Sequence, residues 1–496
     1  MPEVCHTPFL GPTSRESNDG THLCPSLVAP CWHGKHAGSP LDDGYAKTMT
    51  PGPEDLWFLP LGGCGEIGMN LNLFGTDDRW LMVDCGITFE DTVAGNQIQM
   101  PDPSFITERA EKLVGIIITH AHLDHIGALP YLAAALNATI FTTPFTARVL
   151  RPKLRERGCQ ARVVEVPLAS SQTLGPFHVH WLPITHSTPE THALLIETSV
   201  GRILHTADWK IDAQPVVGDG FDITSWQGFR EPAVNALVCD STNALQGGHS
   251  VSEADLESGL LDHVKEASGR VAVGCFASNI ARLQTLGRVA KNSGRYLCLL
   301  GRSLDSMVIA AKSAGYLTED FDPIPAKDIG YLPPFEVMMV TTGSQGEPGA
   351  ALTRLAANTH PLVELDPGDT VIFSAKAIPG NEAKIQRLIT GFSAHGVRVV
   401  VAEGSNKAIH ASGHPNAEEL ASLYTFMQPE LAIPVHGELP HMEENAALAK
   451  RCGVKRQLVG KNGDLFRIAP TPSLLKNAVA VGRLAVDKRG QLSRIS

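Results

Sequence analysis

The sequence predicts an α/β protein, a sandwich of sheets and helices into which a second αβ domain is inserted. Three observations lead to this fold class. The run Leu113–Thr119 is continuous, apolar and rich in β-branched residues, which is typical of a strand buried on both faces. Short strand patterns mix with helical ones, as in layered α/β architectures. Polar motifs suited to chemistry lie on both sides of a second αβ pattern at Glu253–Pro367, which is therefore predicted to be an insertion.

The bulk composition is that of an ordinary globular protein. The chain has 496 residues, enough for two or three domains, with 43% hydrophobic and 19% charged residues. No apolar stretch approaches the roughly 18 residues that a membrane-spanning helix needs, so no membrane partner is expected. No Lys or Arg precedes Arg15 and no continuous apolar block follows, which argues against a secretory signal. The ten cysteines are spread singly and form no disulfide framework, which favours a reducing, cytoplasmic location.

Residues 1–53 differ from the rest of the chain. They are rich in Pro, Gly, Ser, His and Cys and lack hydrophobic periodicity, so we expect a disordered or spurious N-terminal extension. Met49 directly precedes the ordered pattern and is an alternative start. A metal knuckle is the weaker interpretation of this segment, because the spacing of its ligand-type residues matches no Cys-pair template. Those residues are Cys5, Cys24, Cys31, His6, His22, His33 and His36.

The first part of the main domain is predicted at residues 54–244. A helix is expected at Ile126–Ala135, directly after the buried strand, because its apolar residues have helical spacing. The other strands expected in this part are Leu56–Leu61, Asn70–Phe74, Trp80–Val83, Arg162–Val166, His178–Leu182, Ala193–Glu197, Ile203–Thr206 and Ala236–Cys239.

The inserted domain is predicted at residues 245–368. Its pattern runs helix, strand, helix, strand, expected at Glu253–Ala267, Arg270–Cys275, Asn279–Lys291 and Tyr296–Leu300. Residues 369–475 are then expected to complete the main domain, and residues 476–496 to form a short C-terminal remnant.

The segment Gly63–Gly68 fits the G-x-G-x-x-G pattern of dinucleotide-binding proteins, with Asp84 about 20 residues later. Its context does not fit. The next elements are the strand pattern Asn70–Phe74, a turn and the strand Trp80–Val83, so no helix N-terminus is present to bind a pyrophosphate. We therefore expect the glycines to form a tight turn beside the functional site and expect no NAD.

The strongest chemical signal is the segment Thr119–His125 at the end of the buried strand. It carries four metal-ligand side chains within six residues, before the expected helix. On a strand-to-loop segment His120 and His122 project to one side, and Asp124 and His125 can face the other way as the chain turns into the helix. Such a layout supplies ligands to two adjacent metal ions. Surface histidines at a helix start are the alternative, and they explain the spacing poorly.

Three further candidate ligands follow strand patterns or apolar runs later in the chain. They are His186, Asp208 and His436. Taken alone, His186 could be a loop histidine and Asp208 could cap a helix. Three ligand-type residues at strand ends, in this order after the first cluster, are hard to attribute to chance.

This set of residues resembles the metallo-β-lactamase superfamily, which implies an αββα sandwich with two zinc ions and a hydroxide nucleophile between them. The ligands implied are His120, His122 and His186 for one ion and Asp124, His125 and His436 for the other, with Asp208 bridging both. Imidazole and carboxylate ligands suit Zn²⁺, and Mn²⁺ or Mg²⁺ are alternatives. Asp84 would orient a ligand histidine from outside the ligand set.

Further motifs resemble the β-CASP family and, within it, ribonuclease J. They are Leu237–Ala244, Phe276–Ile280, Gly301–Ser303, Thr342–Pro348, Ile378–Glu382, His410–His414 and Pro434–Glu438. The resemblance covers Leu59 to Arg467 with few gaps. It implies that the insertion is a β-CASP αβ domain that clamps RNA over the metal ions.

Residues that bind phosphate are also predicted. Ser278 and Asn279 lie at an expected helix N-terminus, where free N–H groups attract anions, although ordinary helix capping is the common alternative. Gly413 lets the backbone approach a ligand closely. The resemblance implies phosphate binding by Ser278, Asn279, Ser412, Gly413 and His414, and catalytic roles for Asp208, Asp240 and His414. His414 would stabilise or protonate the leaving group, and Asp240 would orient ligands. His410 could contact phosphate or be structural.

The activity implied by the resemblance is zinc-dependent hydrolysis of RNA phosphodiester bonds, in RNA processing and decay. It would combine a 5′-to-3′ exonuclease, which favours single-stranded RNA with a 5′ monophosphate, with an endonuclease. The family commonly forms homodimers or tetramers through a small C-terminal domain. The sequence ends at Ser496 without that domain, which speaks against the larger assembly.

Two other functions stay open. A hydrolase of lactams, lactones or small phosphodiesters would use the same metals, but it needs neither the insertion nor the motifs around Asp240 and His414. A non-catalytic RNA-binding homologue would be expected to lack one or more ligands. The formal net charge of −11 argues mildly against a nuclease, since nucleic-acid-binding proteins are usually basic. Bound metal ions would supply positive potential locally.

Overall fold

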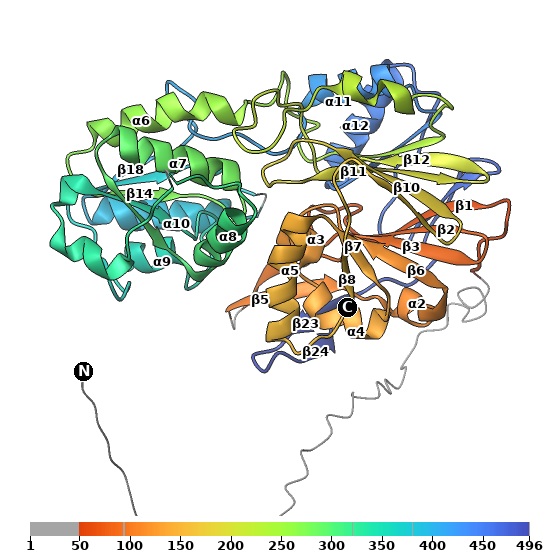
Figure 1. Ribbon diagram of the computed structural model, residues 1–496, viewed down its shortest axis with the longest axis horizontal. Helices are drawn as coiled ribbons and strands as arrows, with labels where there is room; N and C mark the ends of the chain where they lie inside the picture. Colours follow the sequence, from red (N-terminus) through yellow and green to blue (C-terminus); the bar gives the residue numbers. More distant parts are fainter. Residues whose placement is uncertain (1–48, 93–94, 320, 379, 496) are drawn as a thin grey trace, which may run out of the picture. The chain divides into compact units, whose positions relative to one another are not determined.

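The computed structural model describes residues 49–92, 95–319, 321–378 and 380–495 (Figure 1). The prediction of a disordered or spurious extension therefore falls outside the described residues as far as residue 48. Met49, the first described residue, is 6% exposed and belongs to the core. The Gly52 carbonyl accepts a hydrogen bond from the Asp77 N–H at 3.0 Å. Residues 49–53 thus pack on the first hairpin, although the sequence groups them with the extension.

The first sheet of the sandwich has eight strands in the order β22-β21-β1-β2-β3-β6-β7-β8. Strands β1 to β3 form an antiparallel meander, and β3, β6, β7 and β8 pair in parallel. The parallel strands are covered on both faces, which explains the unbroken apolar run in β6. The bounds are β1 (Leu56–Gly62), β2 (Leu71–Thr76), β3 (Arg79–Val83), β6 (Leu113–Ile117), β7 (Ile140–Thr142), β8 (Val163–Glu165), β21 (Leu465–Ala469) and β22 (Ser473–Leu475).

The second sheet has seven strands in the order β20-β19-β13-β12-β11-β10-β9. Strand β13, just before the inserted domain, pairs in parallel with β19, which lies beyond it, with Ala236 opposite Leu431. The two parts of the main domain are therefore joined inside one sheet. The bounds are β9 (Ser171–Leu174), β10 (Phe177–Pro183), β11 (His192–Thr198), β12 (Gly201–His205), β13 (Ala236–Asp240), β19 (Leu431–Val435) and β20 (Arg456–Gln457).

The two sheets stack face to face, with helices outside them (Figure 1). Phe58 and Phe74 from the first sheet share one apolar core with Trp181 and Val238 from the second. Helices α11 and α12 cover the outer face of the second sheet, and α2, α4 and α5 cover that of the first. The predicted αββα sandwich is confirmed. The helices are α2 (Ser104–Thr107), η1 (Ala110–Lys112), α3 (Leu123–Ile126), α4 (Leu129–Leu136), α5 (Pro144–Glu156), η2 (Ile223–Phe229), α11 (Ala417–Met427) and α12 (Leu439–Arg451).

The inserted αβ domain is built on a five-stranded parallel sheet in the order β15-β16-β14-β17-β18. Helices α6, α7 and α8 pack on one face and α9 and α10 on the other (Figure 1). Its elements are η3 (Glu253–Asp255), α6 (Leu256–Glu266), β14 (Val271–Gly274), α7 (Ile280–Asn292), β15 (Tyr296–Leu300), α8 (Arg302–Ser313), η4 (Ala326–Tyr331), η5 (Pro334–Glu336), β16 (Val337–Thr341), α9 (Ala351–Ala356), β17 (Thr370–Phe373), α10 (Glu382–Ala394) and β18 (Arg398–Val400).

This sheet extends beyond the boundary at residue 368 that the sequence predicts. Strand β17 pairs with β14, with Thr370 opposite Val271, and β18 pairs with β17. A buried parallel strand is a short apolar run, and such a run does not reveal which sheet it joins. The inserted sheet therefore ends at Val400.

The C-terminal segment completes a small sheet with the order β24-β23-β5-β4. Its strands are β4 (Thr88–Thr92), β5 (Gly95–Pro101), β23 (Arg483–Val486) and β24 (Leu492–Arg494). Leu484 of β23 lies opposite Met100 of β5, and both side chains are buried. The segment predicted as a remnant is thus packed on the first part of the main domain.

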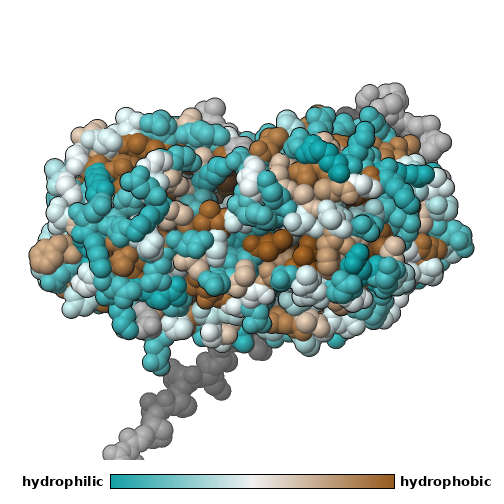
Figure 2. Space-filling model, turned by 90° about the horizontal axis from the view of Figure 1, so that it is seen from above, coloured by the Kyte–Doolittle hydropathy of each residue, from teal (hydrophilic) through white to brown (hydrophobic). Residues whose placement is uncertain are grey.

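Three observations concern the membrane and disulfide expectations drawn from the sequence. Within the parts of the chain that the structure describes, no helix has the length and apolar character that crossing a bilayer demands. The face seen in Figure 2 is mostly polar, with apolar residues scattered over it. The cysteines at described positions are all free thiols.

Candidate metal centre

The predicted ligands all follow strands that end at one edge of the sandwich. His120 and His122 follow β6, His186 follows β10, Asp208 follows β12 and His436 follows β19. In α/β folds the carboxyl ends of the strands are where ligands bind. The backbone is strained there: φ is positive at Asp84 (64°), Ala207 (52°) and His436 (50°). Left-handed conformations of residues other than glycine cost free energy and cluster at functional sites.

One group of side chains brings together His120, His122, His186 and Asp208, each with a ligand atom within 4.8 Å of the others. His122 Nδ1 lies 3.2 Å from His120 Nε2 and 3.0 Å from His186 Nε2. Three imidazole nitrogens that converge on one point, next to a carboxylate, match the donor set that zinc prefers. This group therefore fits a divalent transition-metal ion.

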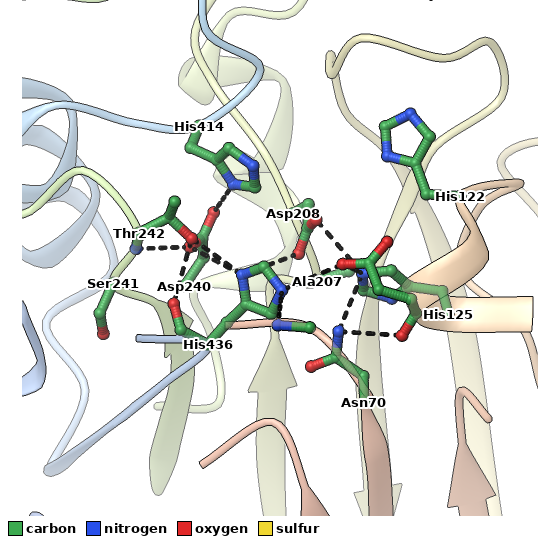
Figure 3. A network of polar contacts seen from close by, with 12 residues as sticks. Asn70, His122, His125, Ala207, Asp208, Asp240, Ser241, Thr242, His414 and His436 are labelled. Atoms are coloured by element: carbon green, nitrogen blue, oxygen red, sulfur yellow. Dashed lines mark hydrogen bonds and ion pairs between the residues drawn. The ribbon is translucent and has the colours of Figure 1, made fainter. Parts of the chain in front are cut away.

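The second group consists of Asp124, His125, Asp208 and His436, again with ligand atoms within 4.8 Å of one another. His125 Nε2 lies 3.2 Å from Asp208 Oδ2, and His436 Nε2 lies 3.4 Å from Asp124 Oδ2. Figure 3 shows Asp208 between His125 and His436. Asp208 belongs to both groups, so its carboxylate is shared by the two sets of candidate ligands.

Burial keeps the three histidines of the first group neutral. Burial, joined by the charge of His125, holds the pKa of His120 well below its usual range. Burial lowers the pKa of His122 to about 4, and burial with the neighbouring His122 lowers that of His186. Metal ions bind neutral imidazoles. These histidines are therefore in the form that binds a cation near neutral pH.

The second group stabilises positive charge on its two histidines. Burial lowers the pKa of His125, but the carboxylates of Asp208, Asp124 and Asp84 outweigh burial and raise it well above its usual range. Burial lowers the pKa of His436, but the carboxylates of Asp208, Asp124 and Asp240 together outweigh burial and raise it to about 10. A site that attracts protons so strongly also attracts metal cations, which compete for the same nitrogens.

Asp84 lies behind this group, as the sequence predicts for an orienting residue. Its Oδ2 is 2.8 Å from His125 Nδ1, and its carboxylate also accepts hydrogen bonds from the Thr119 N–H and hydroxyl. The contact directs Nδ1 of His125 to Asp84 and leaves Nε2 for a metal. Asn70 is a site residue that the sequence did not single out. Its amide nitrogen lies 3.1 Å from His125 Nε2.

The glycine-rich turn borders the site. Gly63, Gly65 and Gly68 have φ of 84°, 88° and 88°, a conformation that glycine adopts without strain. The Gly68 N–H points at His436 Nε2, 3.3 Å away. The segment leads into strand β2, so it forms the turn expected from the sequence and offers no helix N-terminus.

Asp240 and His414 form a third cluster beside the second group. Asp240 Oδ2 lies 2.8 Å from His414 Nδ1, and Asp208, Asp240, His414 and His436 again have ligand atoms within 4.8 Å of one another. The Thr242 hydroxyl donates to Asp240 Oδ1 at 2.7 Å and lies 2.8 Å from His436 Nδ1 (Figure 3). Thr242 thus links Asp240 to His436. Its role was not visible in the sequence, although it lies in the quoted Leu237–Ala244 motif.

The predicted phosphate-binding residues have different surroundings. Asn279 caps α7: its Oδ1 accepts from the Arg282 N–H at 2.8 Å and its Nδ2 donates to Glu253 at 3.1 Å. Both ends of this side chain are engaged, as the capping alternative expects. Ser278, just before it, is half-buried. The Ser412 hydroxyl accepts from Asn243 at 2.8 Å, beside His414.

His410 lies farther from the metal ligands, among groups of the inserted domain. Burial and then the charge of Arg282 lower the pKa of His410 to about 3, so the imidazole is neutral. A neutral buried imidazole has no charge with which to attract phosphate. This favours the structural one of the two roles that the sequence left open.

A buried ion pair supports this region. The side chains of Arg282 and Glu253 are each 1% exposed, with Nη2 3.0 Å from Oε1. Arg282 also donates to the carbonyl of Ser374 at 2.6 Å, and its Nη2 lies 3.4 Å from the carbonyl of Ala411. Through Arg282, the start of α7 is joined to the segment that leads to His414.

Gly413 approaches a protein side chain closely. Its carbonyl oxygen is 2.6 Å from His186 Nδ1 and accepts a hydrogen bond from it, which directs Nε2 of His186 toward the first group. A Cβ at this position would lie 2.5 Å from His186 Cε1 and 2.6 Å from Nδ1. No side chain fits there unless His186 moves.

We therefore expect Gly413→Ala to weaken metal binding by about 10–100-fold, the usual effect of disturbing a group that orients a metal ligand. Competition with a fluorescent chelator measures the change. Gly330→Ala is the control, because a Cβ there meets nothing within 4 Å. Unchanged metal affinity in Gly413→Ala would show that His186 does not depend on this contact.

Three family models match successive parts of the chain. They are the "Metallo-beta-lactamase superfamily" at residues 69–234, the "Ribonuclease J, beta-CASP domain" at 268–392 and the "Zn-dependent metallo-hydrolase RNA specificity domain" at 399–458. The second match crosses residue 368 and supports the longer inserted domain described above.

Known proteins agree with these matches. The chain is 39% identical to the ribonuclease J of Sinorhizobium meliloti over 88% of its own length and 78% of the relative. It is 36% identical to the ribonuclease J of Mycolicibacterium smegmatis over the same shares. A crystal structure of a protein of unknown function from Enterococcus faecalis V583 shares the fold, with a TM-score of 0.58 and 15% identity over 83% of this chain and 100% of the other. The chain belongs to the ribonuclease J family.

Proposed function

We propose that this protein is a metal-dependent ribonuclease that hydrolyses phosphodiester bonds of single-stranded RNA in RNA processing and decay. The observation that carries the proposal is the pair of His/Asp groups sharing Asp208, in a chain whose relatives are named ribonuclease J. We further propose that the enzyme acts as a 5′-to-3′ exonuclease, with endonuclease activity on the same site.

Two metal ions, best matched by Zn²⁺, would be held by the two groups. His120, His122 and His186 would bind one ion, Asp124, His125 and His436 the other, and Asp208 both. When bound, such a pair supplies a nucleophilic hydroxide near neutral pH and positive charge to stabilise a phosphoryl oxygen.

The chain's own groups prepare the ligands. Asp84 holds His125, the Gly413 carbonyl holds His186 and the Thr242 hydroxyl contacts His436, each through Nδ1. Fixing Nδ1 in this way fixes the orientation of each imidazole and would leave Nε2 to hold a metal ion. These contacts reduce the reorganisation needed when ions bind.

His414 is proposed as the residue that acts on the leaving group. Its Nδ1 is engaged by Asp240 at 2.8 Å, so a proton on Nε2 faces away from that carboxylate. Nε2 would donate this proton to the oxygen that leaves when the P–O bond breaks. Asp240 would stabilise the imidazolium before transfer and hold the ring in place, as a buried carboxylate does for a catalytic histidine.

Phosphate binding is proposed for Ser278, Ser412, Gly413 and His414, with Asn279 holding the N-terminus of α7. Helix α7 has 13 residues. Because Asn279 already caps the Arg282 N–H, the anion would be attracted by the positive end of the helix dipole. The enzyme would prefer RNA whose 5′ end carries a monophosphate. Contacts of this kind position an RNA strand without reading its sequence.

The decisive assay compares cleavage of 5′-monophosphorylated and 5′-hydroxyl RNA by protein before and after chelation, with a chromogenic cephalosporin in parallel. We expect cleavage of the monophosphorylated RNA to stop on chelation and to return with Zn²⁺ or Mn²⁺. Circular dichroism of the chelated protein controls for unfolding. Cephalosporin turnover with intact RNA would replace the proposal with a lactam hydrolase, and cleavage that survives chelation would refute the metal mechanism.

A further inference from the structure

A second kind of metal-ligand cluster lies on strands β10 and β11, away from the centre described above. His178 and His180 alternate with the buried Val179, so both histidines project from the same face of β10. Glu197 of β11 lies directly opposite His178 in the antiparallel register. The three side chains therefore share one patch of the sheet surface, and each is partly exposed.

The cluster has the contacts of a preassembled site. His178, His180 and Glu197 each present a ligand atom within 4.8 Å of the others. His180 Nε2 lies 3.0 Å from Glu197 Oε2, and the two imidazole rings stand at 86° with centroids 4.6 Å apart. Ligand atoms on a tetrahedral zinc lie about 3.3 Å apart, given Zn–N bonds of about 2.0–2.1 Å. Small rotations of exposed rings close the remaining difference.

Neighbouring residues orient two of the three ligands. Thr173, opposite His178 on β9, has its hydroxyl 2.9 Å from His178 Nδ1, which leaves Nε2 of that ring for a metal. Arg202 Nε donates to Glu197 Oε1 at 2.7 Å, so the arginine holds one carboxylate oxygen while the other faces His180.

We propose that His178, His180 and Glu197 form an additional transition-metal site for Zn²⁺ or a similar ion, with no part in catalysis. Two imidazoles and a carboxylate suit Zn²⁺, Co²⁺, Ni²⁺ or Cu²⁺, whereas Mg²⁺ and Ca²⁺ prefer oxygen ligands alone. His178 lies five residues before Pro183, where β10 ends, which corresponds to roughly 16 Å along an extended strand. The turn that leads to His186 begins only after Pro183, so the cluster lies away from that residue. A bound ion would tie β10 to β11 near the sheet's β9 edge.

The test counts metal ions in the full chain. Protein stripped with chelator is dialysed against buffered Zn²⁺, and bound metal is measured by mass spectrometry for the wild type and for His178→Asn/His180→Gln. We expect the wild type to bind one more Zn²⁺ per chain and the Co²⁺-loaded wild type to show additional d–d absorption. Mg²⁺ should produce no difference. The catalytic rate should be the same in both proteins.

Two controls keep the result interpretable. His395→Gln removes an exposed imidazole at the end of α10 and should retain the wild-type metal content. Glu197→Gln keeps both imidazoles and should weaken the additional site by about 10-fold or more, and Thr173→Val should act in the same direction. Thermal unfolding in chelator checks that each variant folds. Equal metal content in the wild type and the folded double or Glu197→Gln variant would overturn the proposal, whatever the outcome of the ribonuclease assay.

Discussion

Asp208→Asn is expected to abolish RNA cleavage and to lower the metal content of the protein. The substitution keeps the shape of the side chain but removes the charge that lies between the two groups of imidazoles. Loss of one electrostatic stabiliser from an active site typically costs about 10²–10³-fold in rate, and Asp208 is shared by both groups, so we expect the upper end or more. Single-turnover cleavage of labelled RNA and metal analysis measure the two effects.

Asp219→Asn is the matched control, because Asp219 is an exposed aspartate on the connection that follows β12. It makes the same chemical change outside the metal centre and should leave activity and metal content as in the wild type. Wild-type cleavage by Asp208→Asn would remove the basis of the two-ion mechanism. Loss of activity with full metal content would instead limit Asp208 to a role other than holding the ions.

Glu253→Ala is expected to lower the free energy of unfolding by about 3–5 kcal/mol, the usual cost of leaving a buried charge without its partner. Arg282 would keep its positive charge in a position that is 1% exposed, without the carboxylate that now lies 3.0 Å away. Urea unfolding followed by circular dichroism measures the change. Because Arg282 also contacts the Ser374 and Ala411 carbonyls, we expect weaker binding of 5′-monophosphorylated RNA as well.

An exposed ion pair between α6 and the connection that follows β18 provides the comparison. Asp262 and Lys407 are each about half exposed, and Asp262→Ala should leave the free energy of unfolding close to that of the wild type. The double variant Glu253→Met/Arg282→Met removes both charges and should be more stable than Glu253→Ala. A Glu253→Ala protein as stable as the wild type would mean that Arg282 finds other partners.

The stabilisation from Glu253 should also depend on pH. Burial raises the pKa of Glu253, but Arg282 and Lys210 outweigh burial and hold it below the usual value. A depressed pKa in the folded state means that the stabilisation is complete above the unfolded value of about 4.3 and is lost as the pH falls through the folded value. The stability difference between wild type and Glu253→Ala should therefore shrink in acid.

Much of the candidate metal centre could be predicted because its residues lie at the ends of strands. His120, His122, Asp124 and His125 are adjacent in the sequence, so local geometry alone suggests their arrangement. His436 lies far from these residues in the sequence, and its closeness to them in space was inferred only through the resemblance. The mixture of strand and helix patterns indicated a layered sandwich, and the resemblance to the metallo-β-lactamase superfamily implied its αββα form.

Other features depend on packing that no local pattern encodes. Strand β17 could have joined either parallel sheet, and only its pairing with β14 assigns it to the inserted domain. The pairing of β23 with β5 joins distant segments whose short patterns are not specific. Similarly, the side-chain contacts of Asn70 and Thr242 depend on loops whose course the sequence did not reveal.

The contact between His436 and Asp124 has a consequence for the timing of synthesis. The two residues are 312 positions apart, and every other predicted ligand precedes the inserted domain. At translation rates of about 5–20 residues per second, His436 leaves the ribosome roughly 15–60 s after Asp124. A nascent chain therefore cannot complete the proposed catalytic centre until the whole inserted domain has been translated.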